Sequence, residues 1–380
     1  MSLKIIHIVN WYPNKGQPFK SGWIVKHVKA LDTLCHNDVY HIEVESGPFK
    51  LSNGPGVLGN KVLRLSFSTD IWFLKEIVTC LLVLYVLFIK LKLRDYDVVN
   101  FHIAYPLCTY LHLYQRFIKK PIVITEHWSA YHFNFGVKKE LNRIKRIFNN
   151  NVTWITVSKA LKNDLIRFSG NTALKAFVIP NIVDSVKFTY RQLEKRDNFF
   201  MVSYWKEPKN PFLILSVFRY FLKQNPGIKL RIGGFGPQEK QIIDYIEQKD
   251  IGQSVEYLGS LEPEEIAEEM NKAMAFLHCS EYETFSVVCA EALSCGTPVI
   301  ASAVGGVTEI IEESNGILVQ ENTKADWLSA LNSFINSRDS YNSEGISKKA
   351  AKRFTEKKVG KDYMSVIADT LEISYGEMNQ

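Results

Sequence analysis

The length, composition and charge of the chain limit what it can be. Its 380 residues are enough for two domains, and a composition of 46% apolar and 23% charged residues excludes a disordered chain. Residues 1–190 carry 25 Lys and Arg against 12 Asp and Glu, net +13, whereas residues 191–380 carry 21 against 28, net −7. A basic half predicts an anionic membrane or a phosphorylated lipid as partner. No recognition motif for nucleic acid accompanies it, so we expect no nucleic-acid partner.

The first half alternates short apolar runs with amphipathic segments, which predicts strands and helices in turn. Strands are expected at 4–10, 38–44, 98–102, 122–126 and 154–157, and helices at 21–34, 72–90, 107–116, 137–148 and 158–168. A polar stretch at 189–198 then predicts a linker.

The same alternation restarts after the linker. Strands are expected at 199–203, 229–232, 255–258, 275–278 and 298–302, and helices at 211–224, 238–247, 263–273, 285–294, 323–335 and 356–374. The fold class is therefore α/β, with two tandem Rossmann-like domains whose doubly wound parallel sheets face a central cleft. We expect an N-terminal domain at 1–188, a C-terminal domain at 199–360, and a last helix at 361–380 that returns to the N-terminal domain.

The longest apolar run, residues 77–89, leaves two interpretations open. It is too short to span a bilayer, which needs about 20 residues. It forms either a buried helix of the α/β domain or a helix in the membrane interface. Aromatic and basic residues flank it, as in interfacial helices: Trp72, Phe73, Lys75, Lys90, Lys92 and Arg94.

The start of the chain and its cysteines bear on the compartment. No secretory signal is visible, and the six cysteines include no C-x-x-C pair. Both observations predict a cytoplasmic protein with buried, reduced thiols.

The strongest functional signal lies in residues 283–300, which join a predicted strand to a predicted helix. Glu283 would lie in the loop, and Glu291 about one and a half turns into the helix. The first N–H groups of that helix, near residues 285–287, would attract an anion. The pattern predicts a diphosphate at the helix start, a sugar near Glu283 and a ribose near Glu291.

This stretch resembles the signature of the retaining glycosyltransferases of family 4, which have the GT-B fold. Their E-x7-E motif is matched by Glu283 and Glu291, and their Gly-Gly turn at the site floor by residues 305–306. Residues 178–184 resemble the family's Pro-Asn-Gly-Val-Asp stretch, and residues 232–237 its glycine loop near the nucleotide. The resemblance implies that the following residues bind a nucleotide-sugar donor: Lys206, Lys209, Gly234, Gly236, Leu258, Thr284, Phe285, Ser286, Val287 and Glu291.

In the first half, Thr125, Glu126 and His127 resemble the motif whose histidine lies near the reacting carbon. The resemblance implies a catalytic role for His127, together with Glu283. His102 resembles an upstream strand-end histidine, and Gly22 aligns with a glycine of the family's first loop, so both are expected to bind substrate. A satisfied core histidine is the structural alternative for His102.

The chain also departs from the family pattern. Tyr204 stands where the family has a phosphate-binding arginine, and Lys206 is the residue that could replace it. Ser286 replaces the glycine that usually follows Phe285, and Ile182 replaces the glycine of the interdomain stretch.

The resemblance implies a retaining transfer of a hexose-type sugar from a UDP-sugar, with a GDP-sugar second, to a glycan or polyprenyl-diphosphate-linked acceptor. We expect a role in surface polysaccharide or lipopolysaccharide synthesis, on the cytoplasmic face of the inner membrane. No cofactor or metal is expected beyond the donor, because no His, Asp or Cys cluster has metal spacing. Two alternatives stay open: a GT-B sugar-nucleotide epimerase, and a non-catalytic sugar-nucleotide-binding protein of an assembly.

Overall fold

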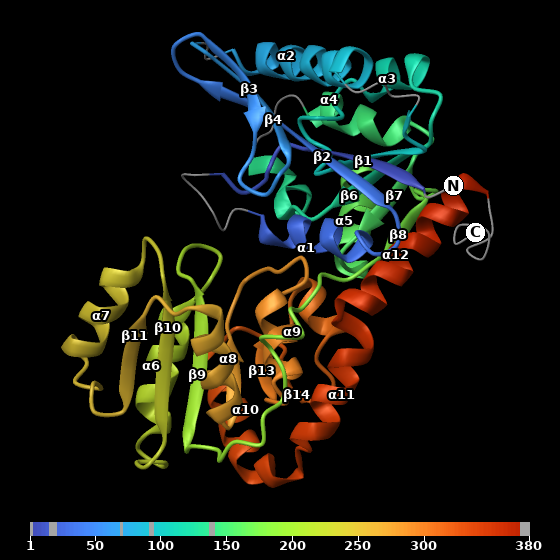
Figure 1. The fold of residues 1–380 in the computed structure, drawn as a ribbon. Helices are drawn as coiled ribbons and strands as arrows, with labels where there is room; N and C mark the ends of the chain where they lie inside the picture. The colour runs from blue at the N-terminus through green and yellow to red at the C-terminus, as the bar shows by residue number, and fades with distance from the viewer. Residues whose placement is uncertain (1–2, 15–20, 69–70, 91–94, 137–140, 373–380) are drawn as a thin grey trace. The chain divides into compact units, whose positions relative to one another are not determined.

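The computed structural model describes residues 3–14, 21–68, 71–90, 95–136 and 141–372. The chain forms two compact units, one of residues 1–181 and 356–380 and one of residues 182–355. Each unit is built on a mostly parallel sheet with helices on both faces (Figure 1), so the predicted α/β class is confirmed. The predicted boundary at 188 and the predicted linker at 189–198 both lie inside the second unit.

The sheet of the first unit positions the first group of candidate residues. Its strand order is β3-β4-β2-β1-β5-β6-β7-β8. The strands are β1 (Lys4–Val9), β2 (His36–Ser46), β3 (Lys50–Pro55), β4 (Lys61–Phe67), β5 (Val98–His102), β6 (Ile122–Glu126), β7 (Thr153–Thr156) and β8 (Ala176–Val178). β1, β5 and β6 are neighbouring parallel strands, so His102 and His127 meet at the carboxyl ends of these strands.

The β3–β4 hairpin was not expected from the sequence. It is the one antiparallel pair among the described strands, and all six residues of β3 are exposed. Because β3 is an edge strand with Ser52, Asn53, Gly54 and Pro55, it lacks the apolar alternation from which strands are predicted.

The helices of the first unit are α1 (Gly22–Leu31), α2 (Trp72–Tyr85), α3 (Leu111–Phe117), α4 (Leu141–Lys145), α5 (Lys159–Ser169) and α12 (Glu356–Leu371). α2 continues as a π-helical turn, η1 (Val86–Lys90), so the helix predicted at 72–90 is present. The first residues of the helix predicted at 137–148 lie outside the described residues. α12 packs closely on α1. A Cβ added at Gly360 would lie only 2.5 Å from the backbone oxygen of Ala30, so glycine allows this approach.

The second unit carries the sheet order β11-β10-β9-β12-β13-β14. Its strands are β9 (Asn198–Tyr204), β10 (Lys229–Phe235), β11 (Val255–Gly259), β12 (Ala275–His278), β13 (Val299–Ser302) and β14 (Gly316–Val319). Its helices are α6 (Pro211–Phe221), α7 (Glu239–Gln248), α8 (Pro263–Lys272), α9 (Val287–Ser294), α10 (Lys324–Ser337) and α11 (Ser343–Phe354). Fully buried Phe199, Phe218 and Trp327 anchor the core between the sheet and these helices.

Two sequence expectations need correction in this unit. The helix predicted from residue 285 begins at Val287, because Ser286 adopts a left-handed backbone conformation with φ 72°. β14 and the Lys-rich α11 were not predicted. Within the described ranges, no helix has both the length and the apolarity needed to cross a membrane.

Candidate functional site

The loop between β12 and α9 presents Glu283 in a small charged cluster. Lys209 Nζ donates a hydrogen bond to Glu283 Oε1, and His278 Nε2 lies 2.9 Å from the same oxygen. His278 is the last residue of β12 and is buried, whereas the Glu283 side chain keeps 14% of its surface exposed. The three side chains therefore meet at the carboxyl end of β12, where open α/β sheets bind ligands.

The environment of Glu283 keeps its carboxyl group ionised. Burial opposes ionisation, but the charge of Lys209 and the hydrogen bond with His278 outweigh it and lower the pKa of Glu283 to about 2. Burial also lowers the pKa of His278, which is therefore neutral at pH 7. Glu283 can accept hydrogen bonds from sugar hydroxyls, and it has no proton to give as an acid.

Two glycines, the pair that resembles the Gly-Gly turn of the family, lie directly under this loop. Gly306 N donates to Glu283 O at 2.9 Å, and Gly305 has φ +46°. A Cβ at Gly305 would lie 1.9 Å from Glu283 O, and one at Gly306 2.4 Å from Thr284 O. Only glycine lets the two backbones approach this closely.

Lys209 is positioned by backbone contacts with the end of β12. It forms an isolated antiparallel bridge with Ser280, and Asn210 N donates to Cys279 O at 3.2 Å. The side chain of Asn210 then caps α6 by accepting from Leu213 N at 3.2 Å. The lysine matched to the family is thus brought to Glu283 across 74 residues of sequence.

Ser286 ends the loop in a conformation that suits glycine. Its φ of 72° is costly for a residue with a Cβ, typically about 1 kcal/mol or more. Its hydroxyl lies 3.2 Å from His278 Nε2 and donates to Cys289 Sγ at 3.1 Å, which ties the loop to β12 and α9. These contacts give a physical reason for serine at this position.

Glu291 lies within α9, about one turn after its start at Val287, and is half-buried. The predicted donor-binding residues Thr284, Phe285 and Ser286 lie in the loop before the helix, and Val287 is its first residue. N–H groups of the first turn of a helix have no intrahelical acceptor, so this end of α9 suits a phosphate group.

The glycine loop at the end of β10 packs against β9. Gly234 and Gly236 have φ of 111° and 144°, and a Cβ on either would clash with the backbone of Ser203 or Trp205. Tyr257 OH donates to Gly234 O at 2.7 Å, which brings β11 and the neighbouring Leu258 to this loop.

The departure at Tyr204 has a local consequence. Lys206 Nζ lies 5.5 Å above the Tyr204 ring, and the Tyr204 ring contacts Phe235 edge-on at 5.2 Å. Lys206 and Tyr204 are both exposed, so the cation stands beside the position where the family has its arginine. A contact of Lys206 with phosphate stays a prediction.

In the first unit, His127 follows β6 directly. It is 7% exposed, and neither ring nitrogen has a hydrogen-bond partner within the described residues. Burial lowers the pKa of His127 well below its ordinary value, and the nearby Asn181 side chain only partly offsets this. A neutral imidazole in this position can accept a hydrogen bond from a ligand hydroxyl or donate one to it.

Glu126 holds the His127 loop in place, a role that the sequence did not reveal. Its carboxylate accepts hydrogen bonds from the backbone N–H groups of Ala104, His127 and Trp128, each at 2.9 Å. Tyr131 OH donates to it at 3.0 Å. The strand-end position of a glutamate beside a candidate histidine was the signal available in the sequence.

His102 lies behind His127 and is fully buried. Its Nε2 is 3.0 Å from His7 Nδ1, and its ring stacks on His127 with centroids 6.1 Å apart. Substrate contact by His102 stays a prediction. Gly22 begins α1, whose Trp23 ring lies 6.4 Å from that of His127, so Gly22 is near the same strand ends.

Within the described residues, no group of three or more His, Cys, Asp or Glu side chains is arranged to hold a metal ion. One Asp-x-Asp pair, Asp95 and Asp97, does occur in the sequence. It precedes β5 at the opposite end of the sheet from His127, and Asp97 accepts a hydrogen bond from Lys4 N at 2.9 Å. Metal independence stays a prediction. All six cysteines are buried and free, as predicted.

Comparison with known families agrees with this geometry. Residues 184–354 match the family described as Glycosyl transferases group 1, and residues 55–187 match Glycosyltransferase Family 4. This chain belongs to the GT-B glycosyltransferases of family 4. The family predicted from the E-x7-E stretch is confirmed, and with it the class of enzyme.

One relative of this glycosyltransferase is named for transfer to a lipid. It is a component of the Arabidopsis thaliana phosphatidylinositol N-acetylglucosaminyltransferase, 24% identical over 276 residues, which cover 71% of this chain and 61% of the relative. The chain thus spans less than two thirds of that relative's length.

Two solved structures share the fold of this glycosyltransferase. Anabaena HepE in complex with UDP has a TM-score of 0.74 at 16% identity, covering 97% of this chain and 100% of that one. The lipopolysaccharide outer core galactosyltransferase WaaB has a TM-score of 0.74 at 20% identity, covering 97% and 99%.

Proposed function

We propose that this glycosyltransferase transfers a hexose-type sugar from a nucleotide-sugar donor to a lipid-linked or glycan acceptor, with retention of configuration. The observation that carries the proposal is the cluster of Glu283, Lys209 and His278 at the carboxyl end of β12, directly before α9. An ionised carboxylate suits sugar hydroxyls, whereas Lys209 and the start of α9 suit the diphosphate that leaves.

A UDP-sugar is the donor that we favour, with a GDP-sugar second. The support comes from the HepE structure, which is a complex with UDP, and from the loop at Gly234 and Gly236, where backbone can approach a nucleotide closely. The Arabidopsis relative is named for N-acetylglucosaminyl transfer to phosphatidylinositol, which makes an N-acetylhexosamine one of the donor sugars to test.

The acceptor is the less defined partner. Relatives named for phosphatidylinositol and for the lipopolysaccharide core support a lipid-linked acceptor, and a polyprenyl diphosphate is the form we propose for polysaccharide synthesis. Such acceptors lie in membranes, so we also propose peripheral association with an anionic membrane on its cytoplasmic side. His127 would hydrogen-bond the donor sugar near its reacting carbon, while the leaving phosphate takes the acceptor proton.

The test is transfer from a panel of UDP- and GDP-sugars to a lipid diphosphate, with release of nucleoside diphosphate and the product anomer measured by NMR. We expect Glu291→Ala to raise the donor KM at least tenfold and His127→Ala to lower kcat about 100-fold, both with unchanged melting behaviour. Exposed Glu247→Ala carries the same charge change as Glu291→Ala and should match wild type. Full activity of Glu291→Ala would remove it from the site, and an inverted product anomer would refute retention.

A further inference from the structure

The side of α2 that faces away from the sheet is apolar along its whole length. The side chains of Cys80 and Val83, and of Val86 at the start of η1, are buried. Other side chains of the same helix stay exposed: Phe73, near its start, is 41% exposed, and Leu81 is 59% exposed. A helix on the surface of a water-soluble unit ordinarily carries polar residues on that side.

The exposed apolar residues continue beyond α2 into η1 and α3. α2 and α3 lie beside one another in the first unit (Figure 1), and the rings of Phe88 and Phe117 meet edge-on with centroids 6.2 Å apart. Phe117 is 60% exposed. We call the following residues the apolar face: Phe73, Ile77, Leu81, Phe88, Ile89 and Phe117. A cluster of exposed large apolar side chains marks a surface that binds a partner.

Among the described residues 71–90, none of the exposed side chains carries a carboxylate. The one acidic residue in 72–90 is Glu76, which is 1% exposed and turned inward, with Arg143 3.8 Å from its carboxylate. Cations stand at the rim: Lys90 ends η1, and Arg116 and Lys119 flank Phe117, all three exposed. Apolar side chains framed by Lys and Arg are the composition of interfacial helices on anionic lipid.

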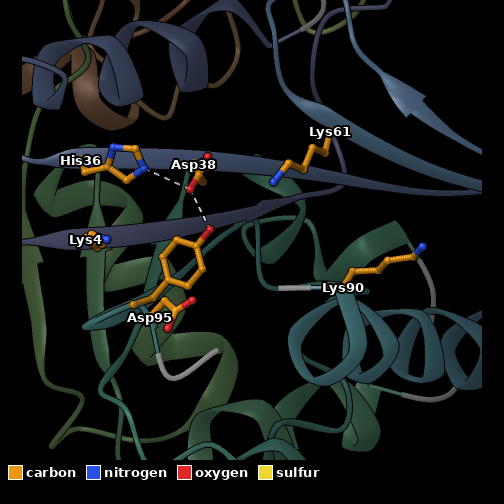
Figure 2. A pocket seen from close by; sticks show the side chains of 7 residues that line it. Lys4, His36, Asp38, Lys61, Lys90 and Asp95 are labelled. Carbon is orange, nitrogen blue, oxygen red and sulfur yellow. Dashed lines mark hydrogen bonds and ion pairs between the residues drawn. The ribbon is translucent and has the colours of Figure 1, made fainter. Parts of the chain in front are cut away.

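A basic pocket lies at the η1 end of the apolar face. Lys4, Lys61 and Lys90 line a cavity of about 290 Å³ beside Asp38 and Asp95 (Figure 2). The Asp38 carboxylate accepts a hydrogen bond from Tyr96 OH at 2.6 Å and lies 3.2 Å from His36 Nε2. Three lysines against two carboxylates give the lining one excess positive charge, which favours phosphate groups at this end of the face.

We propose that the apolar face inserts into the head-group layer of an anionic bilayer, with Lys90, Arg116 and Lys119 contacting lipid phosphates. The inference deepens the proposed function, because it names the surface that would bring the enzyme to a membrane-bound acceptor. Under this proposal, both interpretations of residues 77–89 apply. The inner side of the helix belongs to the core of the unit, and the outer side lies in the membrane interface.

Vesicle flotation tests the surface directly. Leu81→Asp and Val186→Asp each place one carboxylate at an exposed apolar position, the first on the apolar face and the second in the other unit, where Val186 is 86% exposed. With vesicles that contain phosphatidylglycerol, we expect Leu81→Asp to lower partitioning at least tenfold and Val186→Asp to match wild type. Binding should weaken with salt and with pure phosphatidylcholine, because the rim contacts are electrostatic.

A fluorescent label on the L81C thiol gives a second readout, since the six native cysteines are buried. Its emission should shift to the blue on vesicles and be quenched by brominated lipid. Wild-type partitioning of Leu81→Asp would overturn the proposal. So would a label that stays in water, or light scattering that shows the face buried between two copies of the chain.

The surface and the proposed function can fail separately. Transfer to a short-chain, water-soluble acceptor should be unchanged in Leu81→Asp, whereas transfer to the vesicle-bound acceptor should fall. If no transfer is found with any donor while Leu81→Asp still abolishes partitioning, the membrane surface stands and the enzymatic proposal fails.

Discussion

Among single residues, Glu283 has a charge state that bears directly on the proposed donor site. Its carboxylate is held by Lys209 and His278, residues that are far apart from each other in sequence but adjacent in the second unit. Because the pKa of Glu283 is lowered to about 2, the group is an anion at every physiological pH. Glu283 is thus a fixed acceptor of hydrogen bonds, and its loss should affect donor binding more than proton transfer.

The Lys209–Glu283 pair gives a pH-dependent prediction. The folded-state pKa of Glu283, about 2, lies below its ordinary value of 4.5, so the pair stabilises the fold above about pH 4.5 and this contribution is lost as pH falls toward 2. Lys209→Met should lower the free energy of unfolding at pH 7 by up to about 3 kcal/mol. The difference from wild type should shrink below pH 4.5. Urea denaturation across pH checks this.

The control for this change is Lys206→Met, which removes the same charge from an exposed side chain. It should leave the free energy of unfolding within about 0.5 kcal/mol of wild type. A difference between Lys209→Met and wild type that is constant from pH 7 to pH 3 would contradict the assigned ion pair.

At the scale of elements, the loop from β12 to α9 is shaped by the Gly305–Gly306 turn beneath it. Gly306 lies so close to Thr284 and Phe285 that any side chain must displace the loop. The geometry of the proposed donor site therefore depends on two segments that are separated in sequence and packed together at the carboxyl ends of the strands.

Gly306→Ala should disturb this loop. Its Cβ would lie 2.4 Å from Thr284 O, so we expect a loss of about 1–3 kcal/mol in stability and at least a tenfold weaker binding of nucleoside diphosphate. Calorimetry measures both. Gly227→Ala serves as the control because a Cβ there meets nothing within 4 Å. Equal nucleotide affinity in Gly306→Ala and wild type would argue against the loop as the donor site.

At the scale of the whole first unit, four buried histidines gather at the carboxyl edge of the sheet. His7 lies in β1 and His27 in α1. His102 is the last residue of β5, and His127 directly follows β6. His7 contacts His102, and the rings of His27 and His127 are 5.2 Å apart. Tyr363 of α12 closes the cluster from the far end of the chain, 5.9 Å from His27 between ring centroids.

These histidines should make the unit sensitive to acid. Burial lowers the pKa of His7 and of His27 from 6.5 to about 4, so the unfolded chain takes up protons first and stability is lost as pH falls from 6.5 to 4. Each histidine accounts for up to about 3 kcal/mol. His27→Gln should reduce the slope of unfolding free energy against pH in this window, and exposed His112→Gln should not. An unchanged slope in His27→Gln would refute its assignment.

The sequence by itself determined the alternation of strands and helices, the family, and the spacing of Glu283 and Glu291. These features are local, because apolar periodicity and motif spacing depend only on residues that are close together in the sequence. The strands 98–102, 122–126 and 275–278 accordingly coincide with β5, β6 and β12.

Only the tertiary structure decided which side chains become partners. Lys209 meets Glu283 across 74 residues, and Tyr363 meets Asn100 across 263, through parallel strands whose order the sequence does not state. The edge hairpin of β3 and β4 and the exposed outer side of α2 were decided in the same way. Burial depends on which neighbours cover a residue, and for residues 77–89 those neighbours cover one side of the helix and leave the other to a partner.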